Sequence, residues 1–223
     1  MRKTFLIIIL LASLAPVFAQ SVKFGISAGL NESKAAFNQT GSSIKWLAGL
    51  NAGAFAEVEF GSLSLRPGVL YSQKGYKTTT NIVANSPTGG TGGTVSGSGR
   101  SRLNYLEIPV NILYNISVKP GKIFLGGGPY FGYALSGHTK SSTVADYGNG
   151  PAYDNYDFDI VFGKDGYLRR SDFGLNAIAG LKIKNGLLFS VNYGYGLTNV
   201  AKPETGNKDK NRVATFAVGY EFK

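Results

Sequence analysis

Few residues of this 223-residue sequence could do chemistry, and the first to consider is its single histidine. His138 comes two positions after Ser136, and three acids follow further along the same segment: Asp146, Asp154 and Asp157. A serine, a histidine and an acid can form a nucleophilic site if the histidine reaches both partners. One histidine in a polar segment is usually a surface residue. We therefore predict no catalytic residue, and an enzyme that uses His138 is the alternative.

The segment Ala145–Tyr167 is rich in aromatic and acidic residues. Rigid aromatic side chains on a loop are typical of a recognition surface, and the candidates are Tyr147, Tyr153, Asp154, Tyr156, Asp157 and Phe158. Asp154, Asp157 and Asp159 could also gather around Ca²⁺, although their spacing matches no EF-hand loop. Three interpretations stay open: partner binding, calcium binding, and a hairpin that covers the rest of the fold. We predict no metal and no cofactor, and the absence of cysteine excludes thiolate sites.

The glycines of Ser86–Ser101 suggest a phosphate-binding loop, because Gly89–Gly93 and Gly97–Gly99 are glycine clusters. No helix and no lysine follow in the arrangement that such a loop requires. The segment is therefore predicted to be a flexible polar loop.

The elements that must position these residues are β-strands, since apolar and polar residues alternate along most of the chain. Eight such segments are predicted: Val22–Asn31, Trp46–Phe60, Leu63–Gly75, Leu103–Ile116, Ile123–Leu135, Ser171–Ile183, Leu187–Asn199 and Arg212–Phe222. Short connections, such as Gly61-Ser62, alternate with long ones, which is the rule for outer-membrane barrels. The sequence thus predicts an all-β fold, an eight-stranded up-and-down antiparallel transmembrane β-barrel with four long outer loops and three short periplasmic turns.

In a membrane barrel the apolar face of each strand points outward, to lipid. The opposite face is mostly Gly, Ser and Asn, which suits a narrow lumen filled by small side chains. Outward aromatic residues near the strand ends are expected to form two girdles at the membrane interfaces: Phe24, Trp46, Phe60, Tyr114, Phe173, Phe189, Tyr220 and Phe222.

Charged residues on the inward face are expected to form a polar network in the lumen: Glu57, Glu59, Arg66, Lys74, Glu107, Asp172 and Lys182. Opposite charges in so narrow a space are predicted to pair, because an unpaired buried charge is costly. A two-residue turn at Gly61-Ser62 places Glu57 opposite Arg66. We expect a filled lumen, and a narrow pore is the alternative.

Residues 1–19 are typical of a cleaved signal peptide, with a basic start, an apolar run at Phe5–Leu14 and small residues before position 20. Residues 20–223 then form one exported domain, for which nucleic acid is an improbable partner. The net charge of +10 lies largely in or beside the outer loops. This predicts contact with outer-membrane lipid and with the phosphates of lipopolysaccharide.

Four motifs resemble those of a known family: Ser72-Gln73-Lys74-Gly75, Tyr105-Leu106-Glu107-Ile108-Pro109, Gly126-Gly127-Gly128-Pro129-Tyr130 and Tyr195-Gly196-Leu197-Thr198-Asn199. With them, nearly all of the mature chain looks like the PorT-type, OmpX-like outer-membrane β-barrels of Bacteroidota. The resemblance implies the barrel fold and the outer membrane of a Gram-negative bacterium, but no particular activity.

The function that we predict is non-enzymatic: a monomeric barrel that presents extracellular loops for envelope integrity, adhesion or the binding of an envelope or extracellular protein. The alternatives are a component of a protein secretion apparatus, a lipid-modifying outer-membrane enzyme that uses His138, and a narrow pore.

Overall fold

The computed structural model describes residues 22–35, 42–84, 92–148, 150–202 and 209–222. The predicted signal peptide lies outside these described residues. Within them, no helix is long and apolar enough to cross a membrane.

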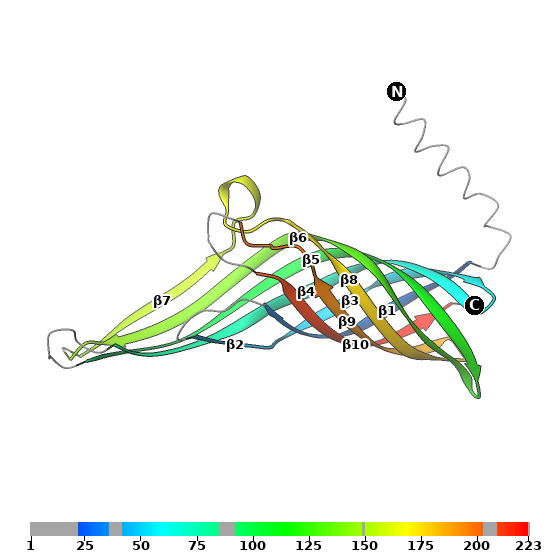
Figure 1. Ribbon diagram of the computed structural model, residues 1–223, viewed down its shortest axis with the longest axis horizontal. Coiled ribbons are helices and arrows are strands. Elements are labelled where there is room, and N and C mark those ends of the chain that lie inside the picture. Colours follow the sequence, from blue (N-terminus) through cyan, green and yellow to red (C-terminus); the bar gives the residue numbers. More distant parts are fainter. Residues whose placement is uncertain (1–21, 36–41, 85–91, 149, 203–208, 223) are drawn as a thin grey trace, which may run out of the picture.

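A closed ring of eight long strands dominates the described part of the chain (Figure 1). They are β1 (Val22–Ala35), β3 (Leu47–Phe60), β4 (Leu63–Ala84), β5 (Gly93–Val118), β6 (Gly121–Asp146), β8 (Ser171–Ile183), β9 (Leu187–Gly196) and β10 (Asn211–Glu221). Each strand pairs antiparallel with the next in this order, and β1 also pairs with β10. The prediction of an eight-stranded up-and-down barrel is confirmed.

The turn between β3 and β4 has the predicted geometry. Phe60 lies opposite Leu63 and Val58 opposite Leu65, so Gly61 and Ser62 form the two-residue connection. Gly61 has a φ of 65°, a left-handed conformation that glycine adopts without a steric penalty. The register that places Glu57 opposite Arg66 is confirmed.

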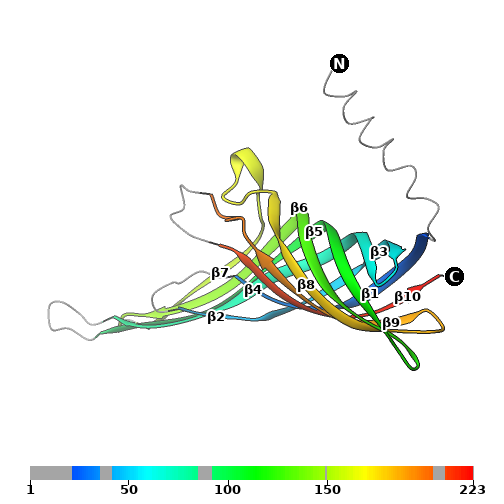
Figure 2. The same cartoon turned by 45° about the vertical axis from the view of Figure 1, so that its right-hand side comes forward.

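Beyond one end of the ring, the strands continue as an open sheet, which Figures 1 and 2 show projecting from the barrel. Two short strands complete it: β2 (Ser42–Lys45) pairs with β4, and β7 (Pro151–Asp159) pairs with β6. We call this the outer sheet: β2, residues 76–84 of β4, 93–102 of β5, 137–146 of β6, and β7. A 3-10 helix, η2 (Gly163–Asp165), follows β7.

The outer sheet corrects two predictions. β4 and β6 extend to Ala84 and Asp146, beyond the predicted strand ends at Gly75 and Leu135. Residues 93–101, expected to belong to a flexible loop, are part of β5 and pair with both β4 and β6. Serine and glycine alternate over residues 96–99, and Val95 is the one large apolar residue of the segment. With little apolar surface on either face, this segment lacks the apolar pattern that marks a strand in sequence.

The two faces of the ring have the predicted polarity. Large apolar side chains on the outside are exposed, for example Leu30 at 59% and Ile112 at 60%. The expectation that small residues fill the lumen is wrong in part, because Phe55 and Phe124 are buried inside it. A Cβ atom at Gly25 would collide with the Phe55 ring. The small inward residues thus make room for a few large ones.

Candidate functional site

The lumen contains two groups of charged side chains, and the first lies at the end with the short turns. We call it the turn-side cluster: Lys23, Glu57, Glu59, Arg66, Lys122, Lys182 and Glu221. Arg66 donates from Nε and Nη2 to Oε2 of Glu57 at 3.0 and 2.7 Å, and Ser64 donates to Oε1 at 2.8 Å. Glu57 has no exposed surface and Arg66 is 5% exposed. Removal of either charge would therefore leave the other buried without its closest partner.

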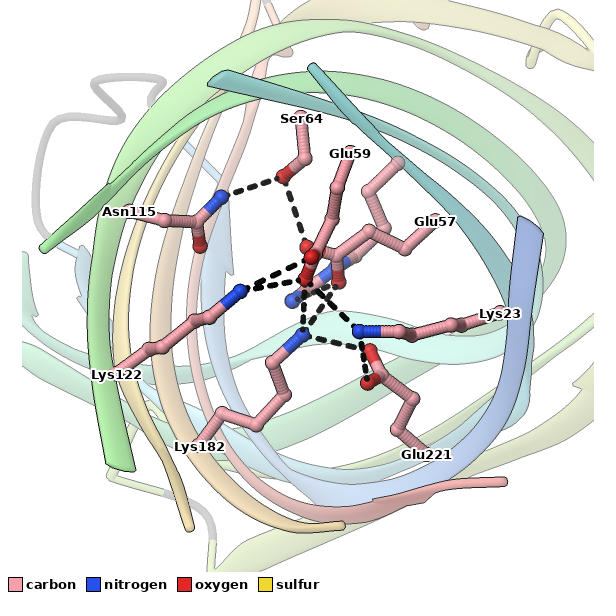
Figure 3. Close-up of polar contacts among 9 residues, drawn as sticks. Lys23, Glu57, Glu59, Ser64, Asn115, Lys122, Lys182 and Glu221 are labelled. Carbon is pink, nitrogen blue, oxygen red and sulfur yellow. Dashed lines mark hydrogen bonds and ion pairs between the residues drawn. The ribbon is translucent and has the colours of Figure 1, made fainter. Parts of the chain in front are cut away.

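Three lysines of the turn-side cluster approach the remaining acids from different sides of the ring. In Figure 3, Lys23, Lys122 and Lys182 point from β1, β6 and β8 toward Glu59 of β3 and Glu221 of β10. Lys182 Nζ lies 2.8 Å from a Glu221 oxygen and 3.2 Å from Glu59. Lys122 and Lys23 approach Glu59 at 2.9 and 3.2 Å. These ion pairs connect strands across the lumen.

A second group, the loop-side cluster, lies nearer the outer sheet: Lys74, Tyr105, Glu107, Tyr130, Asp172 and Asn211. Lys74 Nζ is 2.7 Å from Oε2 of Glu107 and 3.3 Å from Oδ2 of Asp172. The same Asp172 oxygen accepts hydrogen bonds from Tyr130 at 3.2 Å and Asn211 at 2.8 Å. The Lys74 ammonium also lies 4.5 Å from the centre of the Tyr130 ring, a cation–π contact.

A small cavity of about 70 Å³ separates the two clusters, with Arg66 and Lys74 among its lining residues. Asparagines give it a polar wall, and the Oδ1 atoms of Asn111 and Asn192 are buried there without a hydrogen-bond partner. A polar cavity of this size suits a few ordered water molecules. The lumen is thus crossed by side chains above and below one small polar space.

The seven lumen residues singled out from the sequence divide between these clusters. Glu57, Glu59, Arg66 and Lys182 belong to the turn-side cluster, whereas Lys74, Glu107 and Asp172 belong to the loop-side cluster. Sequence reasoning missed three further charges of the lumen: Lys23, Lys122 and Glu221. Lys23 and Glu221 have the inward parity of their strands, so the alternation alone was sufficient to find them.

Residues of all four sequence motifs meet at the loop-side cluster. Lys74, Glu107 and Tyr130 each come from a different motif and meet around Asp172. Gly196 of the fourth motif lies beside them, because a Cβ atom there would be 3.3 Å from the Tyr130 hydroxyl. The motif residues therefore form one structural unit inside the barrel.

His138 lies on the outer sheet between two acids of β7. Its Nε2 is 2.7 Å from Asp157 and its Nδ1 is 2.8 Å from Asp159. The hydrogen bond to Asp159 and the charge of Asp157 raise the pKa of His138. Among the described residues neither ring nitrogen bonds Ser136, whose hydroxyl accepts a hydrogen bond from Asn104. Each ring nitrogen lies within hydrogen-bond distance of a carboxylate, so neither is placed to take a proton from a serine hydroxyl. The geometry favours an ion-pairing role for His138.

The candidate recognition residues lie at and beyond the edge strand β7. All nine residues of β7 are exposed, and they alternate between the two faces. Asp154 and Tyr156 are hydrogen-bonded on one face, while Asp157 and Asp159 bind His138 on the other, so the three aspartates do not gather. Within the described ranges no group of three or more His, Cys, Asp or Glu is arranged to hold a metal ion. Tyr153 and Phe158 are exposed on β7, as is Tyr147 beyond the end of β6.

Comparison with known families agrees with this architecture. The sequence model described as outer membrane protein beta-barrel domain matches residues 18–202. The chain belongs to this family. It is a small outer-membrane β-barrel protein, and its exposed apolar belt faces lipid. The eight aromatic residues predicted for the girdles are all exposed on this belt, from 39% for Trp46 to 61% for Phe24.

The chain also matches several solved outer-membrane proteins at low sequence identity. Ail, the attachment invasion locus protein of Yersinia pestis, solved with the heparin analogue sucrose octasulfate, is 14% identical over 91% of this chain and 99% of its own, with a TM-score of 0.39. Neisserial surface protein A is 14% identical over 92% and 99%, with a TM-score of 0.35. OprG from Pseudomonas aeruginosa is 11% identical over 91% and 97%, with a TM-score of 0.44. No curated protein matches the sequence.

Proposed function

We propose that this outer-membrane β-barrel is a non-enzymatic anchor that presents its outer sheet to a protein of the envelope or the extracellular space. The observation that carries the proposal is β7, whose nine residues are all exposed and which pairs with β6 alone among the described strands. Every second residue of an edge strand directs its N–H and C=O groups away from the sheet. An extended segment of a partner can pair with these groups by strand addition.

The side chains of β7 add specificity to such an edge. Tyr153, Tyr156 and Phe158 are 72%, 51% and 52% exposed, and aromatic residues provide a large contact area at a low entropy cost. The barrel supports the same role, because ion pairs across the lumen hold the strands from which the outer sheet extends. We further propose that the barrel acts as a monomer.

Site-specific cross-linking on intact cells tests this proposal. The sequence contains no cysteine, so Tyr153→Cys introduces a single thiol on β7 and Val83→Cys, at an exposed position of β4, provides a matched control. We expect Tyr153→Cys to form an adduct with one defined protein and Val83→Cys to form none. Equal adducts at both positions, no adduct at Tyr153→Cys, or an adduct with a second copy of the chain would contradict the proposal.

The assignment to the PorT-type, OmpX-like barrels of Bacteroidota is proposed in the same way. Its support is the convergence of the four motifs on the loop-side cluster. If it holds, relatives that carry all four motifs retain a cation at the position of Lys74 and acids at those of Glu107 and Asp172. Export through a signal peptide, residues 1–19, predicts that N-terminal sequencing of the mature protein begins at Gln20.

A further inference from the structure

The outward face of the outer sheet carries basic residues at directly opposite positions on neighbouring strands. Lys45 of β2 lies opposite Lys77 of β4, Lys77 opposite Arg100 of β5, and Arg100 opposite Lys140 of β6. Two residues nearer the barrel, Arg102 lies opposite His138. We call this set the cation rows: Lys45, Lys77, Arg100, Arg102, His138 and Lys140. Along β5 the rows share the face of Leu106 and Ile108, which face lipid in the barrel.

The protein neutralises only one side of these rows. Asp157 pairs with Lys140 and His138, and Asp159 pairs with His138. In the described part of the chain no carboxylate forms an ion pair with Lys45, Lys77, Arg100 or Arg102, and Nε of Arg102 is buried without a hydrogen-bond partner. Like charges directly opposite on adjacent strands are about 5 Å apart at Cβ and destabilise a sheet. A bound anion would therefore stabilise these rows, and the described residues supply none to Lys45, Lys77, Arg100 or Arg102.

The position of the rows indicates where those anions come from. On β4, β5 and β6 the last row of three apolar side chains is Tyr71, Leu106 and Tyr133, which lie opposite one another and are all exposed. Exposed Leu135 follows in the irregularity of β6. Arg102 lies four residues beyond Leu106, which on a strand tilted by about 45° is roughly 9 Å above it. This is the level of lipid head groups just outside the hydrocarbon layer.

A groove of about 680 Å³ follows the rows and is lined by Lys45, Lys77, Arg100 and Lys140. Asp157 also lines it, at the Lys140 side, where it is already paired with that lysine. The next row outward contributes hydroxyl and amide groups to the same groove, from Thr79, Ser98, Ser142 and Asn155. Guanidinium and ammonium groups beside hydroxyl donors are the chemistry that binds phosphate.

We propose that the cation rows bind the phosphate groups of a phosphorylated glycolipid in the outer leaflet, with Lys45, Lys77 and Arg100 as the main ligands. This site lies on a face of the outer sheet rather than at the β7 edge. The proposal can therefore be tested independently of the proposed protein partner.

Binding of purified lipopolysaccharide to the detergent-solubilised full-length barrel tests the proposal. Trp46, the single tryptophan, follows Lys45 directly and provides a fluorescence signal beside the rows. The variant is the triple substitution Lys45→Gln, Lys77→Gln and Arg100→Gln. The matched control replaces three exposed cations elsewhere, Lys119, Lys164 and Lys184, by glutamine. We expect the variant to lose about tenfold or more in affinity, since three charge-assisted contacts are removed, and the control to bind like the wild type.

Three further probes identify the ligand. Dephosphorylated lipid A should bind the wild type as weakly as lipopolysaccharide binds the triple variant. Inorganic phosphate, at the same phosphate concentration, and polyglutamate should compete poorly. The proposal is overturned if the triple variant binds like the control, if dephosphorylation has no effect, or if inorganic phosphate or polyglutamate competes as well as the glycolipid. Heat-modifiable gel migration of the variants verifies that each has formed its barrel.

Discussion

The lumen and the outward face of the outer sheet are both rich in charged side chains, but these are paired within the chain in the lumen and largely unpaired on the sheet. Inside the ring every charge named above has a partner of opposite sign, from Glu57 with Arg66 to Lys74 with Glu107. On the outer sheet, Lys77 and Arg100 lie opposite each other, and neither has a carboxylate partner among the described residues. The same strands, β4 and β5, contribute to both regions.

The difference follows from what surrounds each region. A charge in a narrow lumen has little water, so the chain must supply its counter-charge. A charge on an exposed face is solvated, so it does not need a counter-charge from the same chain and can pair with an anion of a ligand. The contrast indicates that the paired charges of the lumen stabilise the barrel. The unpaired charges of the outer sheet mark a surface that binds a ligand.

The largest effect is expected at the core of the turn-side cluster. Arg66→Ala and Glu57→Ala should each lower the free energy of unfolding by about 3 to 5 kcal/mol, because each leaves a buried charge without its closest partner. The double variant should lose clearly less than the two single losses added together. Urea unfolding of the barrel in lipid vesicles measures all four species of the cycle, and an absence of coupling would contradict the pairing.

A smaller and pH-dependent effect is expected at Asp209, in the connection before β10. Burial, with the Asp172 carboxylate nearby, raises the pKa of Asp209 to about 6. The Asp209 carboxyl holds its proton more tightly in the folded than in the unfolded state. Its contribution to the free energy of unfolding is therefore complete below the ordinary pKa of about 3.9 and is lost as the pH rises through about 6. Asp209→Asn should therefore raise the free energy of unfolding by about 2 kcal/mol at neutral pH and change little in acid.

Urea unfolding of the wild type and of Asp209→Asn, each at neutral pH and in acid, provides the measurement. Thr215→Val, a substitution of another buried polar side chain of the lumen, should change stability equally at the two pH values and serves as the control. A difference between wild type and Asp209→Asn that does not vary with pH would show that the carboxyl keeps its ordinary pKa.

A spectroscopic effect is expected at His138, where the outer sheet does contain acids. The hydrogen bond to Asp159 raises the pKa of His138 above the ordinary value of about 6.5. Asp159→Asn should lower this pKa, whereas Asp154→Asn, on the opposite face of β7, should leave it unchanged. NMR titration of the single histidine reports the midpoint directly, and a wild-type midpoint at or below the ordinary value would refute the ion pairing.

No ion conductance is expected from the lumen. Side chains of the two clusters cross the ring on either side of a cavity of only about 70 Å³. Planar-bilayer recordings of the purified barrel should show no sustained current above background. Reproducible discrete channels at neutral pH would favour the narrow pore instead.

The sequence predicts the ring well because one face of each strand is apolar. Alternation along β3 and β4, together with the Gly61-Ser62 turn, is sufficient to place Glu57 opposite Arg66. The outer sheet is harder to predict, since residues 93–101 of β5 are polar on both faces and only their backbone pairing makes them a strand.

The cation rows were beyond sequence reasoning for a related reason. They depend on the register of four strands at once, including a shift between β5 and β6 at Asn104 and Tyr105. Because of this irregularity, Arg102 lies opposite His138 rather than opposite the preceding residue of β6. The sequence shows how many basic residues the segment contains, but not that they lie opposite one another on neighbouring strands.

Two lysines of β4 test the contrast between the regions most directly. Lys74 is buried in the loop-side cluster and Lys77 is exposed in the cation rows, three residues further along the same strand. In vesicles that lack phosphorylated lipid, Lys74→Ala should lower the free energy of unfolding by about 3 kcal/mol or more. Lys77→Ala should leave it unchanged or raise it slightly, because a like-charge contact is removed. Equal losses for the two substitutions, or a larger loss for Lys77→Ala, would contradict the account.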